Sequence, residues 1–311
     1  MKILYISDLG FEGYLPPQIY SRPPLTWIHT LGAYNIHHSK VNTIQESFDI
    51  AIIASIHENI NVQNISINDI RKVAKKVGIQ QESHHRNYLT AKGIIDSIYF
   101  ISLYQNCDFI LTHNEIDSKY FSSLFDKPVF HHPQLLDLDT SLYDKKEEII
   151  LPGNLDFRYG NFDNYLIGLE TGLTINIPKM HTYRAEESYL ENIIHHSYEP
   201  DYIKFNKMIG TSKYSLYLIP YPLGGSFPIQ CAMMKTPCLS WNTSQTALDL
   251  YPELSFEYGD FNSVKAKLKE LIQNQSYIDE LNDYAYKIVL DKYTNIEYYK
   301  TYMFDLLNKI K

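Results

Sequence analysis

The segment 214–241 constrains the fold more than any other part of the chain. It begins with an apolar run, residues 214–220, whose length and composition predict a buried strand. A glycine-rich turn follows, and Ser226 is expected to cap a short helix that ends near Lys235. Residues 237–241 predict the next strand. A strand, a turn, a helix and a strand in this order are typical of a parallel sheet, so an α/β fold is expected.

The glycines of this turn, Gly224 and Gly225, allow the backbone to approach a ligand closely, and the start of the following helix attracts anions. The run 225–237 resembles the donor site of GT-B glycosyltransferases. In that family a glycine turn, a Pro, an acidic residue followed by Ala-Met, and a small residue followed by Pro bind the nucleotide of a nucleotide sugar. The matching residues here are Pro228, Ala232, Met233 and Pro237.

One element of this motif differs. The acidic residue that holds the ribose hydroxyls in the family falls at Gln230 or Cys231, and the interval from Ala-Met to Pro is one residue shorter. The alternative interpretation is a buried helix of a parallel sheet that binds no ligand.

The resemblance implies two Rossmann-like domains that face each other across a cleft, and 311 residues are enough for two such cores. Residues 1–132 would form the acceptor-side domain, 133–146 a linker and 147–293 the donor domain. The last helix, within 294–311, would cross back onto the first domain.

The resemblance also implies donor-binding residues. A loop after the strand expected at 148–152 begins with a glycine and supplies a basic residue for the diphosphate. The expected donor-binding set is Gly153, Arg158, Gly224, Gly225, Ser226 and Gln230.

The loop after the first strand, residues 2–7, is expected to face the cleft near the donor phosphates or the acceptor. It contains Gly10, Glu12 and Gly13, and a flexible turn is the alternative. Asp8 stands where a dinucleotide-binding fingerprint has its first glycine, so a nicotinamide cofactor site is not expected.

A polar cluster follows the strand expected at 78–82. Glu82 and His84 lie two residues apart, so both side chains can face the same way from an extended chain at the carboxyl edge of the sheet. A carboxylate beside an imidazole can abstract a proton. These two residues are the leading candidates for a catalytic base, with His57, His113 and Glu12 next.

No metal site or cofactor is expected. The twelve histidines include four adjacent pairs, but none has the spacing of a ligand set. Asp137 and Asp139 match the D-x-D metal motif of another glycosyltransferase fold only superficially, because they fall in the linker.

Composition limits the kinds of partner and the cellular location that are expected. A net charge of -8 argues against a broad nucleic-acid-binding face. Three cysteines without a C-x-x-C pair favour the reducing cytoplasm. No apolar window is long enough for a membrane span.

The sequence therefore predicts a metal-independent transfer of sugar from a nucleotide sugar to an unidentified acceptor, which could be a glycan, a protein or a small molecule. The alternatives are a nucleotide-sugar epimerase of the same fold and a non-catalytic nucleotide- or glycan-binding protein. Local patterns also predict helices over residues 66–77, 186–195 and 201–208.

Overall fold

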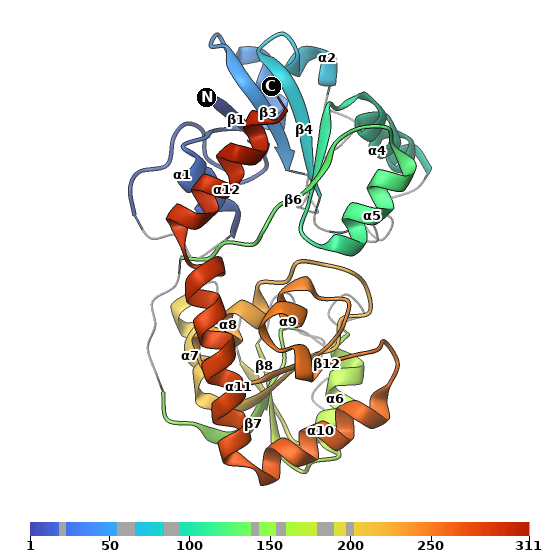
Figure 1. Cartoon of the computed structure of the whole chain (residues 1–311), viewed down its shortest axis with the longest axis vertical. Coiled ribbons are helices and arrows are strands. Elements are labelled where there is room, and N and C mark those ends of the chain that lie inside the picture. Colours follow the sequence, from blue (N-terminus) through green and yellow to red (C-terminus); the bar gives the residue numbers. More distant parts are fainter. Residues whose placement is uncertain are drawn as a thin grey trace. The chain divides into compact units, whose positions relative to one another are not determined.

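The computed structural model describes residues 1–18, 23–54, 66–81, 83, 94–137, 143–153, 160–178, 190–196 and 202–310. These residues form two parallel six-stranded sheets with interleaved helices, which confirms the expected α/β fold (Figure 1). The chain divides into two compact units. Unit 1 comprises Met1–Leu135, Pro222–Gly224 and Asn295–Lys311, and unit 2 comprises Leu136–Tyr221 and Gly225–Thr294.

The sheet of unit 1 has the strand order β2-β1-β3-β4-β5-β6, and every neighbouring pair is parallel. Its strands are β1 (Ile3–Ser7), β2 (Tyr34–His37), β3 (Phe48–Ala54), β4 (Ala74–Gln81), β5 (Phe109–Thr112) and β6 (Val129–His131). The chain moves outward from β1 to β2 and then returns to β3 on the other side of β1. The strand order therefore reverses beside β1, at the kind of position where open α/β sheets bind ligands.

Alternating side chains of the unit 1 strands supply two cores, one on each face of the sheet. Tyr5 and Ile52 face the helices α1 and α12, whereas Ile6 and Ile53 face α2, α4 and α5. The helices are α1 (Pro23–Leu31), α2 (Ile67–Ile70), α4 (Ile94–Asn106), α5 (Glu115–Leu124) and α12 (Ile296–Asn308). A short 3₁₀ segment, η1 (His38–Thr43), follows β2.

The sheet of unit 2 has the order β12-β11-β10-β7-β8-β9 and is also parallel. Its strands are β7 (Lys146–Ile150), β8 (Thr174–Pro178), β9 (Ile193–His196), β10 (Ser212–Tyr217), β11 (Cys238–Trp241) and β12 (Ser255–Phe256). The chain runs from β7 out to β9 and returns to β10, so the order reverses between β7 and β10.

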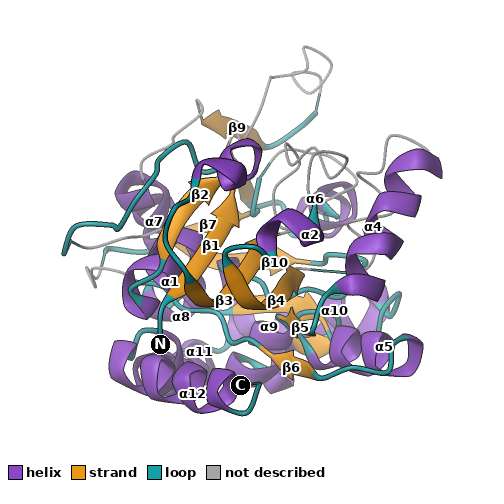
Figure 2. Cartoon of the chain, turned by 90° about the horizontal axis from the view of Figure 1, so that it is seen from above, coloured by secondary structure: helices purple, strands orange, loops and turns teal. Residues whose placement is uncertain are grey.

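Helices flank the strands of unit 2 in Figure 1, and Figure 2 colours the helices of the chain purple and its strands orange. The helices of unit 2 are α6 (Asn161–Leu169), α7 (Tyr202–Thr211), α8 (Phe227–Met233), α9 (Gln245–Leu250), α10 (Phe261–Gln273) and α11 (Gln275–Ile288), and α11 continues into a π-helical turn, η6 (Val289–Tyr293). No helix in the described part of the chain is both long and apolar enough to cross a membrane.

Two expected helices are wrong in part. The helix predicted over residues 66–77 is only the four-residue α2, capped by Ser66, and the rest enters β4, which pairs with β3. The end of the helix predicted over 186–195 is the strand β9, because Ile193 pairs with Ile175 of β8. In both cases a partner strand distant in the sequence decides the conformation. The helix predicted over 201–208 is confirmed as α7.

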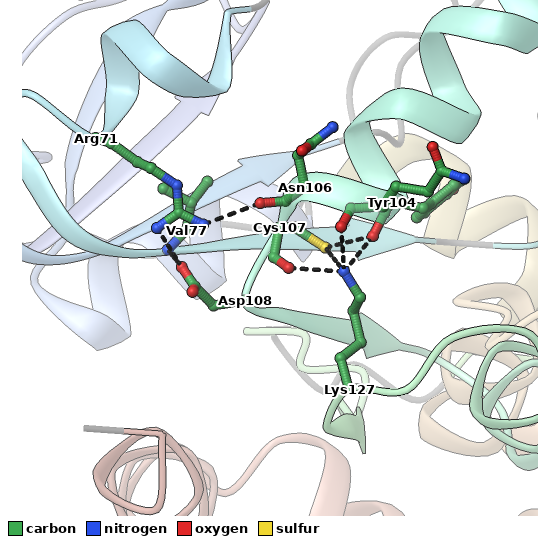
Figure 3. A network of polar contacts seen from close by, with 8 residues as sticks. Arg71, Val77, Tyr104, Asn106, Cys107, Asp108 and Lys127 are labelled. Carbon is green, nitrogen blue, oxygen red and sulfur yellow. Dashed lines mark hydrogen bonds and ion pairs between the residues drawn. The ribbon is translucent and has the colours of Figure 1, made fainter.

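A polar network fixes the junction of α4 and β5 in unit 1 (Figure 3). The Lys127 ammonium donates to the backbone oxygens of Tyr104, Gln105 and Cys107 at the end of α4, where a cation complements the helix dipole. Arg71 pairs with Asp108 at 3.0 Å and donates to the Asn106 oxygen. Burial raises the pKa of the Cys107 thiol to about 11, so this cysteine is a packing residue and not a nucleophile.

Candidate functional site

The loops that follow β7 and β10 are the first candidate site in unit 2. β7 and β10 are hydrogen-bonded neighbours, and the strand order of the sheet reverses between them. Gly153 lies after β7, and the turn with Gly225 and Ser226 lies after β10. Both loops therefore start from the carboxyl edge of the sheet at its reversal point, where an anionic ligand can meet backbone N–H groups.

A chain of buried asparagines joins these two loops. The Asn161 amide donates to the Gly153 oxygen at 2.6 Å, and the Asn164 amide donates to Asn161 Oδ1 at 2.8 Å. The Asn164 oxygen accepts from the Leu218 N–H at 2.9 Å. Both asparagines are fully buried at the start of α6. Because each buried amide group is costly to leave unpaired, the chain fixes the Gly153 loop relative to the end of β10.

Gly160 makes this arrangement possible. Its φ is +60°, and an added Cβ would lie 2.0 Å from the Leu218 carbonyl oxygen. The residue thus has to be glycine for two reasons, its left-handed backbone and its close approach to the backbone after β10.

The glycine pair after β10 is explained by packing within each unit. Gly225 has a φ of +83°, its oxygen accepts from Thr246 Oγ1 at 2.7 Å, and an added Cβ would lie 2.9 Å from Ser244 Oγ. Gly224 groups with unit 1, where an added Cβ would lie 2.7 Å from the Cβ of His113 and 2.5 Å from Gln134 Nε2. Close side-chain packing therefore requires both glycines.

The helix that follows this turn differs from expectation in its cap. Ser226 has a helical backbone conformation and its side chain makes no capping hydrogen bond, so the predicted cap is wrong. All seven residues of α8 are buried. Gln230, one of the two positions where the family's ribose carboxylate would fall, donates from its amide to Asn206 Oδ1 at 2.9 Å. Neither this amide nor the thiol of Cys231 is the acid that the resemblance has at these positions.

Several expected site residues lie outside the described residues. These are Arg158 of the donor set, the two leading base candidates Glu82 and His84, and the further candidate His57. Their positions relative to the loops described above stay predictions.

The loop with Gly10, Glu12 and Gly13 is fixed on the neighbouring strand β2. The backbones of Gly13 and Asn35 exchange hydrogen bonds of 2.9 and 3.0 Å, and the Asn35 amide donates to the Phe11 oxygen. Glu12 pairs with Lys40 at 2.6 Å. Gly10 and Gly13 have φ values of +75° and +105° with open space at the Cβ position, so the backbone turn explains both glycines.

His113 belongs to a buried network at the carboxyl edge of unit 1 that sequence reasoning did not foresee. Tyr5 donates to the oxygen of Gln80, whose Nε2 lies 3.1 Å from His113 Nε2 and 3.2 Å from His132 Nδ1. His132 Nε2 lies 2.6 Å from the hydroxyl of Tyr299 on α12. The indole of Trp27 stacks on His113 at 4.8 Å.

The amide protons of Gln80 determine which ring nitrogens of His113 and His132 carry a proton. Gln80 Nε2 has two protons and no lone pair, so His113 Nε2 and His132 Nδ1 have to accept them. His113 Nδ1 then donates to the His132 backbone oxygen at 2.7 Å. Both imidazoles are therefore neutral, and burial lowers the pKa of His113 to about 3 and that of His132 well below its usual value. A histidine held in this way is a structural residue and a poor base at neutral pH.

Among the side chains of the described ranges, no three His, Cys, Asp or Glu residues lie close enough together to hold a metal ion.

Comparison with known proteins reveals similarity in structure alone. The sequence matches no family model and no curated protein sequence. HepE from Anabaena in complex with UDP-glucose superposes with a TM-score of 0.70 at 9% identity, over 99% of this chain and 100% of HepE. The α,α-trehalose 6-phosphate synthase from Burkholderia multivorans gives 0.66 at 8% identity, over 87% of this chain and 72% of that one.

A third similar structure is TarM from S. aureus with fondaparinux, α-GlcNAc-glycerol and UDP. It gives a TM-score of 0.66 at 12% identity over 84% of this chain. This chain spans only 55% of the TarM length. The three similarities establish the fold as the GT-B fold that the donor motif predicts.

Proposed function

We propose that the protein is a GT-B glycosyltransferase that moves a sugar from a nucleotide-sugar donor to a hydroxyl-bearing acceptor. The observation that carries this proposal is the pair of loops after β7 and β10, which start at the reversal point of the unit 2 sheet and are joined by Asn161 and Asn164. The similar HepE and TarM structures hold UDP-glucose and UDP, which supports a uridine nucleotide as the first donor to test.

In the proposed reaction an acceptor oxygen forms a bond to the anomeric carbon, and the bond from that carbon to the diphosphate breaks. The electron pair leaves with the diphosphate, whose added charge would be stabilised by Arg158 and by the backbone N–H groups of the turn with Gly225 and Ser226. The acceptor proton would pass to the pair Glu82 and His84. Charge stabilisation by protein groups makes a metal unnecessary, so we propose that the reaction is metal-independent.

One observation favours a second candidate function. The ribose carboxylate of the family would fall at Gln230 or Cys231, neither of which is acidic, and the Gln230 amide is already bonded to Asn206. A nucleotide- or glycan-binding protein without turnover fits this substitution. Release of UDP from UDP-glucose by the full chain distinguishes the two, because a binding protein raises its melting temperature with UDP but releases nothing.

The cytoplasm is the proposed location. Cys107, Cys231 and Cys238 are all buried and free, and unpaired cysteines suit a reducing compartment.

The donor site is tested by calorimetric titration of the full chain with UDP and GDP. Arg158→Ala removes charge-assisted hydrogen bonds to phosphate, each worth about 1.5 to 3 kcal/mol, so UDP affinity is expected to fall roughly tenfold or more. Lys207→Ala, which removes an exposed cation from the same unit, is the control and should leave affinity unchanged. EDTA should leave the UDP affinity unchanged. Unchanged UDP affinity in Arg158→Ala would exclude the proposed diphosphate contact.

A further inference from the structure

Gln134 of unit 1 is a buried side chain whose hydrogen-bonding groups are not used. It lies shortly after β6, at the carboxyl edge of the sheet, and is only 5% exposed. Its side-chain amide makes no hydrogen bond in the part of the chain that the structure describes. A buried amide without a partner costs free energy, and native proteins rarely keep one without a reason. A ligand that pairs with the amide when it binds is such a reason.

The side chains beside Gln134 are already paired. The Cβ of His113 and the Nε2 of Gln134 lie 2.7 and 2.5 Å from the position that a Cβ on Gly224 would take. His113 uses both ring nitrogens, since Nε2 pairs with Gln80 and Nδ1 with the His132 backbone oxygen. His132 uses both of its ring nitrogens as well. The partner of the Gln134 amide therefore has to come from outside this network.

The position of Gly224 indicates which part of a substrate lies near this amide. Gly224 belongs to unit 1 together with Gln134, and it directly precedes Gly225 of the turn that we propose binds the diphosphate. Consecutive Cα atoms are about 3.8 Å apart, so the chain places the amide of Gln134 about one residue from that turn. In a nucleotide sugar the sugar is bonded to the diphosphate. The sugar is therefore the part of the donor expected beside Gln134.

The chemistry of the amide selects the same kind of ligand. A primary amide has two N–H donors and one carbonyl acceptor. Ionised phosphate oxygens only accept, so a phosphate would leave the carbonyl of Gln134 unpaired. A sugar hydroxyl both donates and accepts, and neighbouring hydroxyls on one ring can pair with both groups of the amide. The His113 ring beside Gln134 is neutral and provides no charge for an anion.

We propose that Gln134 binds hydroxyl groups of the sugar that is transferred, and that it thereby helps to select which nucleotide sugar reacts. This inference rests on the proposed glycosyltransferase activity, because it assigns a residue to the donor of that reaction. It adds a residue of unit 1 that the donor motif of unit 2 does not contain.

Calorimetric titration of the full chain with UDP and with three UDP sugars tests this role. The sugars are glucose, galactose and N-acetylglucosamine, and the UDP sugar that binds the wild type most tightly is used further. Gln134→Ala removes the amide, so it should weaken binding of that UDP sugar about fivefold or more and change UDP affinity less than about twofold. Gln105→Ala, which truncates an exposed glutamine of the same unit, is the matched control and should change neither affinity.

Deoxy analogues of that UDP sugar, each lacking one hydroxyl, identify the group that Gln134 binds. At least one analogue should bind the wild type about fivefold more weakly than the parent compound. In Gln134→Ala that difference should disappear, because the partner of the missing hydroxyl is already absent. Differences that are the same in the wild type and the variant would overturn the proposal.

Thermal unfolding separates binding from structure. Gln134→Leu replaces an unpaired buried amide with an apolar side chain, so its melting temperature should equal or exceed that of the wild type while binding of the UDP sugar is weakened. UDP binding without binding of any of the three UDP sugars, normal binding of the UDP sugar by both Gln134 variants, or a loss that UDP shares would overturn the proposal. A wild-type chain that does not bind UDP would instead contradict the proposed function.

Discussion

At the scale of single residues, Gly160 and Gly172 differ in what surrounds the same backbone conformation. Their φ values are +60° and +71°, but an added Cβ would lie 2.0 Å from the Leu218 oxygen at Gly160 and would meet nothing within 4 Å at Gly172. An alanine at Gly172 therefore meets backbone strain alone, whereas an alanine at Gly160 meets the same strain together with steric overlap.

Gly172→Ala is expected to cost about 1 kcal/mol of unfolding free energy, the usual penalty of a left-handed alanine. Gly160→Ala adds the overlap with Leu218 and should cost about 3 kcal/mol or more. Urea unfolding of both variants measures the difference. Equal losses would show that the contact with Leu218 relaxes at no cost.

The proposed base also belongs to this scale. Glu82→Gln or His84→Ala should lower turnover by at least about a hundredfold while UDP affinity and melting temperature hardly change, because the loss of a general base typically costs about 10²- to 10⁴-fold. Glu46→Gln, an exposed carboxylate of the same unit, is the control. Near-normal turnover in both variants would remove the base assignment and leave the fold untouched.

At the scale of elements, α6 holds two loops in place through one side chain. Asn164→Leu keeps the branching at Cγ but removes the amide, so the buried Leu218 N–H loses the acceptor at 2.9 Å and Asn161 Oδ1 loses the donor at 2.8 Å. The expected cost is about 2 to 4 kcal/mol, together with weaker UDP binding. Leu166→Ala, an exposed residue of the same helix, should cost less than about 0.5 kcal/mol. A stable Asn164→Leu variant with normal UDP affinity would contradict the role of the asparagine chain.

Sequence patterns predicted most elements because apolar runs and helix caps are local. Asn114 caps α5, and the apolar runs around Ile52 and Leu216 are buried strands. The two wrong segments became strands through pairing with distant partners, which no local window contains. Ser226 failed as a cap because helical geometry already includes it.

Only those parts of the candidate site that belong to the donor motif could be predicted from the sequence. The glycine turn and the Gly153 loop followed from the donor motif, whereas the asparagine chain did not, although two asparagines three apart at a helix start were a signal. His113 and His132 are nineteen residues apart, and only the sheet brings them together. The unpaired amide of Gln134 is invisible in a sequence, since it depends on what surrounds the side chain.

At the scale of the molecule, the buried histidines make stability depend on pH. The pKa of His113 falls from 6.5 to about 3 on folding, and that of His132 falls well below 6.5. The unfolded chain therefore binds more protons, so stability is complete above about pH 6.5 and is lost as pH falls toward the folded pKa values. Each ring costs about 1.4 kcal/mol per pH unit in this window.

The unfolding free energy of unit 1, measured in urea, should fall by about 2 to 3 kcal/mol between pH 7.5 and 5.5. Most carboxyl groups titrate below this range. His113→Gln removes one ring and should halve the slope. A stability that does not change over this range would mean that folding does not lower the pKa of these rings.

The core of unit 1 also sets an order of events during synthesis. Tyr299, Met303 and Leu307 of α12 complete the face that Ile3 and Trp27 begin, and Tyr299 contacts His132. The ribosome makes α12 only after all of unit 2. Residues 1–135 of unit 1 therefore emerge before α12 can cover this apolar face, so this core is completed only after unit 2 has been translated.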